Sequence, residues 1–317
     1  MQGIFVYLGF FAIIAILFPQ YLHNNLFRGL IFGSLPIVIF EIFEEMHYIG
    51  KIKFKIPPFM RLLGHVLWWI LAVYIAHLGH QEILLWGVKY ILPERLFMWA
   101  FIIRSILRVN AINRFDGIYA QASGVSSIGF LTIFILIQFV VFRYYINFTA
   151  ENMQILTFVK NISFVLFSIS LISTIVEYKP LGLVRDIGIM FFGFSLAYLS
   201  VVGGAKIGTL VVTLSLVIFD AIRVGIYRIF IMKKNPLKGD YTHLHHRLMG
   251  LWWERKEIRI FVRGWSLIMM IFMLIQWTDR TNKLIIFLVM AVVFFGTNYY
   301  LFIAKRLPCW LAIKKNN

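Results

Sequence analysis

The chain has 317 residues, of which 61% are hydrophobic, 17% aromatic and only 14% charged, with a mean hydropathy of +0.82. Soluble domains are usually about half apolar and a quarter charged, so this composition excludes a soluble protein and indicates a polytopic membrane protein. The formal net charge of +17 comes from 31 Lys and Arg against 14 Asp and Glu. That excess favours the anionic cytoplasmic leaflet and phosphorylated ligands as partners. The basic residues lie between apolar segments and not on a compact soluble module, which argues against nucleic acid.

The chain has a single cysteine, Cys309, which excludes an internal disulfide framework and a thiolate metal cluster. The N-terminal segment 1–17 lacks a basic start and runs almost directly into Pro19. It therefore does not resemble a cleaved signal peptide, and we expect it to be a retained span.

The apolar segments predict an all-α fold, in which one integral-membrane domain over residues 1–317 forms a polytopic bundle of about ten transmembrane helices. The predicted spans are 4–19, 28–43, 60–78, 96–109, 124–142, 161–176, 188–203, 207–229, 260–277 and 283–304. The fourth span gives the weakest signal because Arg104 lies within it. Segment 80–92 is too short and too mixed to cross, so we interpret it as interfacial or re-entrant.

The distribution of Lys and Arg predicts the orientation of these spans. The loops after the second, fourth, sixth and eighth spans and the C-terminal tail hold most of them. They include Lys51, Lys53, Lys55, Arg61, Arg108, Arg114, Lys179, Arg185 and the basic residues of 223–263. We therefore expect a multi-pass protein of the cytoplasmic (inner) membrane with both termini in the cytoplasm.

Acidic residues follow the same side of the membrane. Glu44, Glu45, Asp116, Asp186 and Asp240 all fall at predicted cytoplasmic span ends. Ionisable groups at such depths are costly, and they usually mark functional sites. If the helices form a bundle, these residues meet at one cleft on the membrane surface.

The segment from Asp220 to Arg247 combines an acid in an apolar helix with a basic stretch and the sequence His243-Leu244-His245-His246. Arg, Lys and His offer charged donors to several phosphate oxygens at once, so the segment is a candidate phosphate site. A different interpretation stays open for the basic residues alone, because a cytoplasmic loop is rich in Lys and Arg in any case.

The acids beside this cationic segment predict Mg²⁺, which binds one or two carboxylates together with phosphate oxygens and water. The alternative is Zn²⁺ on His243, His245 and His246, which would need a suitable geometry and an orienting second shell. Magnesium and phosphate account better for the acids.

Four segments together resemble one known family, the polyprenyl-phosphate N-acetylhexosamine-1-phosphate transferases. Segment 235–249, NPLKGDYTHLHHRLM, is similar to the family pattern S-P-F-x-x-D-x-x-H-[IL]-H-H. Segment 110–125, NAINRFDGIYAQASGV, resembles N-A-x-N-x-x-D-G-x-D-G-L-x-x-G. Segment 183–194, LVRDIGIMFFGF, resembles F-M-G-D-x-G-S-x-x-x-G-F, and EIFEEM at 41–46 lies where the family has two Asp residues. The H-x-H-H form is more similar to the N-acetylglucosamine branch.

The resemblance implies a reaction of cell-envelope polysaccharide biosynthesis, such as that of cell wall, lipopolysaccharide or O-antigen. The phosphate of a polyprenyl (undecaprenyl) phosphate attacks the β-phosphorus of a UDP-N-acetylhexosamine, which gives a polyprenyl-diphospho-sugar and UMP. Such an in-line displacement depends on positioning and on charge neutralisation. The resemblance also permits a homodimer.

The resemblance also implies roles for individual residues. Asp186 would hold Mg²⁺, and Glu44 and Glu45 would orient or deprotonate the lipid phosphate. Asp116 and Asn113 would line the nucleotide-sugar cleft. The remaining matched positions are expected to bind substrate; they are Asn110, Asp240, His243, His245 and His246. Outside the matched motifs, Arg61 and His65 either contact the lipid phosphate or form an interfacial anchor pair.

The chain departs from the family pattern at several of these positions. Glu44 and Glu45 are one methylene longer than Asp, which moves a carboxylate by about 1.5 Å, and a shift of about 1 Å can cost on the order of 10²-fold in rate. Tyr119 replaces the second Asp of the D-G-x-D element, and Arg185 replaces the Gly before the metal-binding Asp. That Arg is expected either to pair with Asp186 or to substitute for part of the Mg²⁺ charge. Gly3 aligns with the end of the family's first cytoplasmic loop, so we expect the family's first span to be absent.

Three functions therefore remain open. The first is a working transferase of this chemistry. The second is a catalytically degenerate member that binds polyprenyl phosphate or a nucleotide sugar as a scaffold or partner, which the changes at Glu44, Glu45, Tyr119 and Arg185 favour. The third is a transporter of anionic lipid or solute, which would place ionisable residues on both sides of the membrane.

Overall fold

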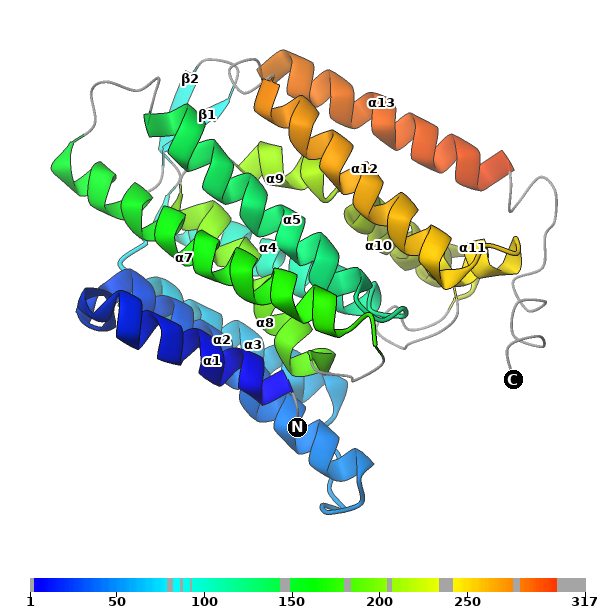
Figure 1. The fold of residues 1–317 in the computed structure, drawn as a ribbon, viewed down its shortest axis with the longest axis horizontal. Helices are drawn as coiled ribbons and strands as arrows, with labels where there is room; N and C mark the ends of the chain where they lie inside the picture. Colours follow the sequence, from blue (N-terminus) through cyan, green and yellow to red (C-terminus); the bar gives the residue numbers. More distant parts are fainter. Residues whose placement is uncertain are drawn as a thin grey trace.

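The computed structural model describes residues 3–78, 82–85, 88–91, 93–142, 149–179, 184–203, 207–233, 242–275 and 280–300. These residues form a bundle of helices with one short hairpin (Figure 1). The helices that precede the hairpin are α1 (Gly3–Leu17), the 3₁₀ helix η1 (Pro19–His23), α2 (Asn25–Tyr48) and α3 (Pro58–Ile75). The hairpin pairs β1 (Glu82–Leu85) with β2 (Val88–Ile91) in antiparallel register, with Glu82 opposite Ile91.

The second half of the bundle follows the hairpin. It comprises α4 (Glu94–Arg114), α5 (Gln121–Ile135) continued by the π-helix η2 (Leu136–Val141), α7 (Ala150–Val176) and α8 (Arg185–Val202). It ends with α9 (Ile207–Thr213), α10 (Ser215–Ile226), the π-helix η3 (Tyr227–Ile231), α11 (Leu244–Gly250), α12 (Arg255–Ile275) and α13 (Arg280–Asn298).

Seven of the described helices are long and apolar enough to cross a membrane: α2, α3, α4, α5 with η2, α7, α8 and α12. Two shorter apolar helices, α1 and the 284–298 part of α13, accompany them. The predicted all-α polytopic membrane bundle is therefore confirmed. The fourth predicted span, which had the weakest signal, is part of the long helix α4 despite Arg104.

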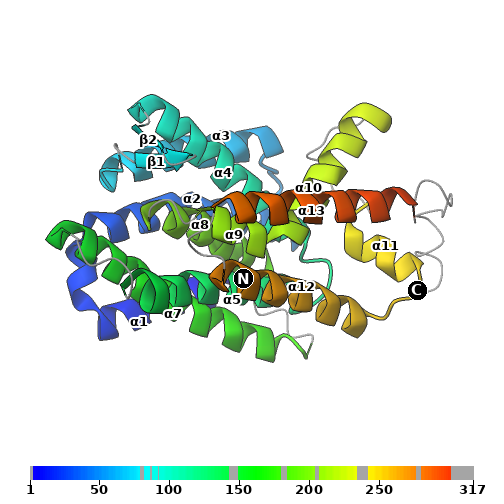
Figure 2. The same ribbon diagram turned by 90° about the horizontal axis from the view of Figure 1, so that it is seen from above.

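Helix α8 lies at the centre of the bundle. It contacts α1, α2, α4, α5, α7 and α9, and every residue from Ile187 to Val202 is buried. A helix that is apolar on all sides is stable only when it is covered on all sides. In Figure 2, α1 and α7 lie on one side of this centre, and α3 and α4 on the other. Any residue at the first turn of α8 is therefore held against several neighbouring helices.

The structure corrects the eighth predicted span, 207–229, which is not a single helix. It is divided into α9, α10 and η3, with a break at Leu214, where the backbone has φ −97° and ψ 17°. The β-branched run before the break is stiff at χ1. In addition, the Thr213 hydroxyl donates to the Thr209 carbonyl, and the Trp265 indole N–H donates to the Ser215 hydroxyl at 3.1 Å. Such side-chain hydrogen bonds compete with a regular helix.

The edges of several other spans also differ from the prediction, because hydropathy detects the apolar middle of a helix and not its ends. Helix α2 continues to Tyr48, past Glu44 and Glu45, and α7 begins at Ala150, where the Thr149 hydroxyl caps it. Arg108, which we had expected in a loop, lies inside α4 and is buried, with its guanidinium donating to the Leu196 carbonyl at 2.8 Å and the Ser200 hydroxyl at 2.7 Å. Segment 80–92, interpreted as interfacial or re-entrant, contains the two strands.

Candidate active site

The polar residues singled out in the sequence gather at one end of the bundle. The last turns of α2, α4 and α7 and the first turns of α3, α5 and α8 all lie at this end, toward the lower right of Figure 1, and α11 lies beside them. We call it the site end. Glu44, Glu45, Asp116 and Asp186 are all at helix ends here, so the predicted convergence of separate loops is seen in the structure.

A group of carboxylates and arginines, which we call the acid–arginine cluster, joins the end of α2 to the starts of α3 and α8. Its members are Glu41, Glu44, Glu45, Arg61, Arg185 and Asp186. The Arg61 guanidinium lies 3.3 Å from Glu41 Oε1 and 3.6 Å from Glu44 Oε2, and Lys55 Nζ lies 4.0 Å from Glu44 Oε1. Arg61 therefore neutralises the α2 acids, which favours neither of the roles that the sequence left open for it.

Arg185 continues the cluster onto α8. Its Nη1 lies 2.9 Å from Glu45 Oε1, and the guanidinium remains more than half exposed whereas the Glu45 side chain is largely covered. The next residue, Asp186, is exposed and forms no ion pair with any described residue.

Asp116 extends the site toward the loop between α4 and α5. It is half-buried, and burial raises its pKa well above the ordinary value, with further contributions from the negative charges of Glu177 and Asp186. Carboxylates that raise one another's pKa in this way gain when a cation binds between them. Asp116 therefore lies within the electrostatic reach of Asp186 and Glu177.

Glu177 is a part of this site that the sequence analysis missed. It is buried at the end of α7, where its carboxylate accepts hydrogen bonds from the Ser123 hydroxyl at 2.9 Å and from the Val184 N–H at 3.1 Å. Burial raises its pKa, although the Ser123, Val184 and Ala120 hydrogen bonds and Arg263 oppose that rise. Glu177 thus ties the first turn of α5 to the residue before Arg185. Its position at the end of an apolar span was the available signal.

Two arginines of α12 hold the loop between α4 and α5 from the other side. Arg263 donates to the Ala120 carbonyl and, at 2.7 Å, to the Tyr178 hydroxyl, and Arg259 donates to the Tyr119 carbonyl at 3.4 Å. Both guanidinium groups also lie over the Tyr178 ring, at 4.9 and 5.2 Å from its centroid. Their spacing of four residues on a helix is the signal that the sequence analysis did not use.

The second group, which we call the histidine cluster, comprises Asp220, Arg223, His243, His245 and His246. Asp220 is fully buried in α10, and its carboxylate accepts hydrogen bonds from the Leu244 N–H at 3.0 Å and Arg223 at 2.7 Å. His243 Nδ1 lies 2.9 Å from Asp220 Oδ2. Asp220 therefore fixes the start of α11 and the orientation of the His243 ring.

The basic residues of this segment are used mainly for structure. Arg223 also donates to the Thr242 carbonyl at 2.6 Å, and Arg228 is buried, with Nη2 3.5 Å from the Thr242 hydroxyl. Both side chains anchor the segment that leads into α11. They are placed less well to bind an external phosphate than the sequence suggested.

His245 connects the histidine cluster to the Asp116 loop. Its ring is buried, it packs so closely on Gly117 that a Cβ at that position would overlap it, and it lies 6.1 Å from the Phe115 ring. Neither ring nitrogen has a hydrogen-bond partner among the described residues. Burial, with smaller contributions from His246 and His243, lowers the His245 pKa to about 3. His245 is therefore neutral near pH 7 and has one N–H and one lone pair available.

The remaining predicted site residues have different positions and contacts in the structure. The Asn110 amide donates to the Ile106 carbonyl of its own helix at 2.8 Å, and Asn113 is half-buried one turn later, beside Asp116. The His246 ring centroid lies 4.0 Å from that of His245. His65 is buried and stacked on Trp69. Asp240 lies outside the described residues.

The implied Mg²⁺ fits part of this arrangement. Mg²⁺ takes one or two carboxylates, with phosphate oxygens and water as the other ligands, and the exposed Asp186, with Asp116 at the same end of the bundle, is suited to that need. Glu44 and Glu45 fit less well because Arg61, Lys55 and Arg185 already neutralise them. Among the described residues no group of three or more His, Cys, Asp or Glu side chains is arranged to hold a metal ion. The three histidines therefore do not form the zinc site considered as an alternative.

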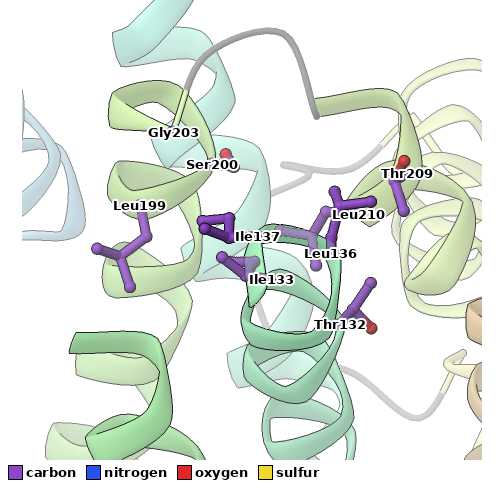
Figure 3. Close-up of a pocket in the computed structure, with 9 residues that line it drawn as sticks. All are labelled: Thr132, Ile133, Leu136, Ile137, Leu199, Ser200, Gly203, Thr209 and Leu210. Carbon is purple, nitrogen blue, oxygen red and sulfur yellow. The ribbon is translucent and has the colours of Figure 1, made fainter. Parts of the chain in front are cut away.

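A small pocket elsewhere in the bundle has no part in this site (Figure 3). It is lined by Thr132, Ile133, Leu136, Ile137, Leu199, Ser200, Gly203, Thr209 and Leu210. Ser200 lies about 20 Å from Asp186 along α8, at 1.5 Å per residue. The lining is mainly aliphatic, so the pocket is a packing defect near the far end of α8 and not the candidate site.

Comparison with curated proteins finds a "probable undecaprenyl-phosphate N-acetylglucosaminyl 1-phosphate transferase" of Bacillus subtilis (strain 168). It is 26% identical over 231 residues, which are 69% of this chain and 57% of that protein. The chain thus spans little more than half the length of this relative. A search of protein-family models finds no match. The similarity nevertheless agrees with the family resemblance seen in the four motifs.

Proposed function

We propose that this chain is a membrane transferase that moves N-acetylhexosamine-1-phosphate from a UDP-sugar to a polyprenyl phosphate, such as undecaprenyl phosphate, and releases UMP. The observation that carries the proposal is the convergence of Asp186, Asp116 and the histidine cluster at one end of a membrane bundle. The similarity to a probable transferase of this chemistry supports it independently.

The residues at the site end would have different roles in this reaction. Asp186, with Asp116, would hold Mg²⁺, which when bound neutralises the diphosphate and makes its phosphorus more electrophilic. Arg61 holds Glu44 beside this position, and Glu44 would orient the lipid phosphate or accept its proton. A nonbonding electron pair on the lipid phosphate oxygen forms the new P–O bond, and the bond to the UMP phosphate breaks with its electrons going to UMP.

The histidine cluster would bind the diphosphate from the opposite side. Asp220 holds His243 in one orientation, so its second ring nitrogen is presented in a fixed direction. His245 is neutral, so it would act as a hydrogen-bond donor and not as a charge. The location that this function needs is the cytoplasmic face of the inner membrane, where nucleotide sugars are available, and a homodimer remains compatible with it.

The proposal is tested with purified protein in detergent, supplied with Mg²⁺, undecaprenyl phosphate and a panel of UDP-N-acetylhexosamines, with products read by mass spectrometry. We expect UMP and a polyprenyl-diphospho-sugar, and Asp186→Asn should reduce their formation by at least about 10²-fold. Glu151→Gln removes an exposed acid at the other end of α7 and is the matched control. No product from any sugar, in protein that folds normally, would refute the transferase.

A second function is favoured by one observation. Arg61, Lys55 and Arg185 already neutralise Glu44 and Glu45, as they would in a relative that binds polyprenyl phosphate or nucleotide sugar without turnover. The same assay separates the two functions. Retained binding of undecaprenyl phosphate or UDP-sugar, without UMP release, identifies the binding protein.

A further inference from the structure

Arg185 has a backbone conformation that a non-glycine residue rarely adopts. Its φ is +42°, in the left-handed region, which a Cβ makes unfavourable for residues other than Gly, Asn and Asp. Strained residues of this kind are retained when the surrounding structure holds them, and they are concentrated at functional sites. The strain here falls directly before Asp186, at the first turn of the buried helix α8.

The strained backbone directs the Arg185 guanidinium across to α2. Nη1 reaches Glu45 Oε1 at 2.9 Å, and Asp186 directly follows Arg185 in the chain. One cation thus pairs with an acid that lies 140 residues away in sequence, beside the acid that would hold Mg²⁺. Two carboxylates from separate elements are also the arrangement that a divalent cation commonly bridges.

Stability alone does not account for this contact. The Arg185 side chain is 54% exposed, and an ion pair exposed to that degree contributes little to stability. It is too weak to offset the cost of the left-handed backbone. The exposed part of the guanidinium has N–H donors that Glu45 does not use, and the planar fork of Arg suits phosphate oxygens.

We propose that the Arg185 guanidinium takes, at Glu45, the place of a second divalent cation next to the Asp186 position, so that the protein meets an incoming phosphate with a built-in cation. This inference rests on the proposed function for its phosphate ligand. It has a consequence that does not depend on turnover. While Arg185 is present, Glu45 is withheld from metal, and without a phosphate ligand the Arg185 charge weakens the binding of a divalent cation at Asp186.

The test is binding of Mn²⁺, which prefers the same oxygen ligands as Mg²⁺ and whose free concentration is read by electron paramagnetic resonance. Four proteins are compared without substrate: wild type, Arg185→Gly, Arg185→Asn and Arg185→Lys. Gly and Asn both tolerate a positive φ and remove the charge, whereas Lys keeps the charge. We expect Mn²⁺ to bind at least about tenfold more tightly to the Gly and Asn variants, because the positive charge that pairs with Glu45 and repels a cation beside Asp186 is removed. The Lys variant should resemble wild type.

Equal Mn²⁺ affinity in wild type, Arg185→Gly and Arg185→Asn would overturn the inference, as would equally tight binding to the Lys and Gly variants. Adding Glu45→Gln to Arg185→Gly should return Mn²⁺ affinity toward the wild-type value, which shows that Glu45 is the ligand released. The product assay is separate from this test. If Mn²⁺ affinity shifts as expected but no UMP is released, the Arg185 inference stands and the proposed function is refuted. If UMP is released but Mn²⁺ affinity does not shift, the proposed function stands and the Arg185 inference is refuted.

Discussion

The acid–arginine cluster and the histidine cluster lie at the same end of the bundle, but they are held in different ways. The acid–arginine cluster is partly exposed, and its carboxylates repel one another and share cations at 2.9 to 3.6 Å. The histidine cluster is arranged around one fully buried acid, Asp220, that accepts three hydrogen bonds or ion pairs. The first group is suited to exchange partners with a ligand, and the second is suited to stay fixed while the ligand binds.

The largest expected effect on stability is at Asp220, the buried acid of the histidine cluster. Asp220→Asn removes the charge that Arg223 and His243 both face, and it leaves a buried cation without compensation. We expect a loss of about 3–5 kcal/mol in the free energy of unfolding, measured by denaturant titration in detergent. Asp186→Asn should change stability by less than about 1 kcal/mol, because that carboxylate is exposed. Similar losses from both variants would remove the distinction between the two clusters.

The contact between His245 and Gly117 joins the histidine cluster to the Asp116 loop. A larger side chain at Gly117 therefore tests whether the two parts of the site are packed together. Gly117→Ala would place a methyl group in the His245 ring. We expect a destabilisation of about 1–3 kcal/mol from this overpacking, together with reduced UMP release. Gly225→Ala is the matched control, because a Cβ on that helical glycine meets nothing within 4 Å. If both variants behave alike, His245 does not pack on the loop as described.

The lowered pKa of His245 makes the stability of the histidine cluster depend on pH. The folded protein holds this ring neutral, with a pKa of about 3 against 6.5 for the unfolded chain. Below about pH 6.5 the unfolded chain therefore binds a proton that the folded protein does not, so stability falls as pH falls. Between about pH 6.5 and pH 5 the loss from this group is at most about 2 kcal/mol.

The measurement is denaturant unfolding at several pH values, for wild type and for His245→Asn. The variant should lose part of the acid destabilisation. His23→Asn, which replaces an exposed histidine of η1, should retain the wild-type slope. An unchanged slope in His245→Asn would show that the ring is not buried and neutral.

A smaller effect on stability is expected at Glu177, which joins the first turn of α5 to the residue before Arg185. Glu177→Gln keeps an acceptor for Val184 and the Ser123 hydroxyl but removes a negative charge near Asp116. We expect a stability loss of about 1 kcal/mol and a lower pKa for Asp116. The acid limb of the pH profile of UMP release should therefore move to lower pH. A shift toward higher pH would show that Glu177 does not act on Asp116 through its charge.

Most residues of both clusters, and Asp116 between them in the chain, could be predicted from the sequence, but few of their contacts could. Glu44, Glu45, Asp116 and Asp186 are acids at the ends of apolar segments, and helix geometry then brings such ends together. The Arg185–Glu45 pair could not be predicted, since it joins residues 140 positions apart and depends on a local left-handed backbone. The break at Leu214 depends on side-chain hydrogen bonds, which hydropathy does not detect.

The buried partners of the site were the hardest to predict. Glu177 is a single acid in no motif, and its importance arises from Ser123 and Val184, which meet it only in the folded chain. The sequence indicated a phosphate site for the whole segment from Asp220 to Arg247, and it did not show that Asp220 and Thr242 engage Arg223. A count of charges cannot distinguish an anchoring arginine from one that is free to bind a ligand.

The central claim is that the two clusters act on one ligand in one reaction. It is tested most directly by a double-mutant cycle on UMP release with Asp186→Asn and His246→Gln, with Asp186→Asn and Glu151→Gln as the control pair. If both clusters act on the same phosphoryl transfer, the double variant should be little worse than the poorer single variant. The control pair should be additive. Additive losses for Asp186 and His246, or a wild-type protein that releases no UMP, would contradict the account.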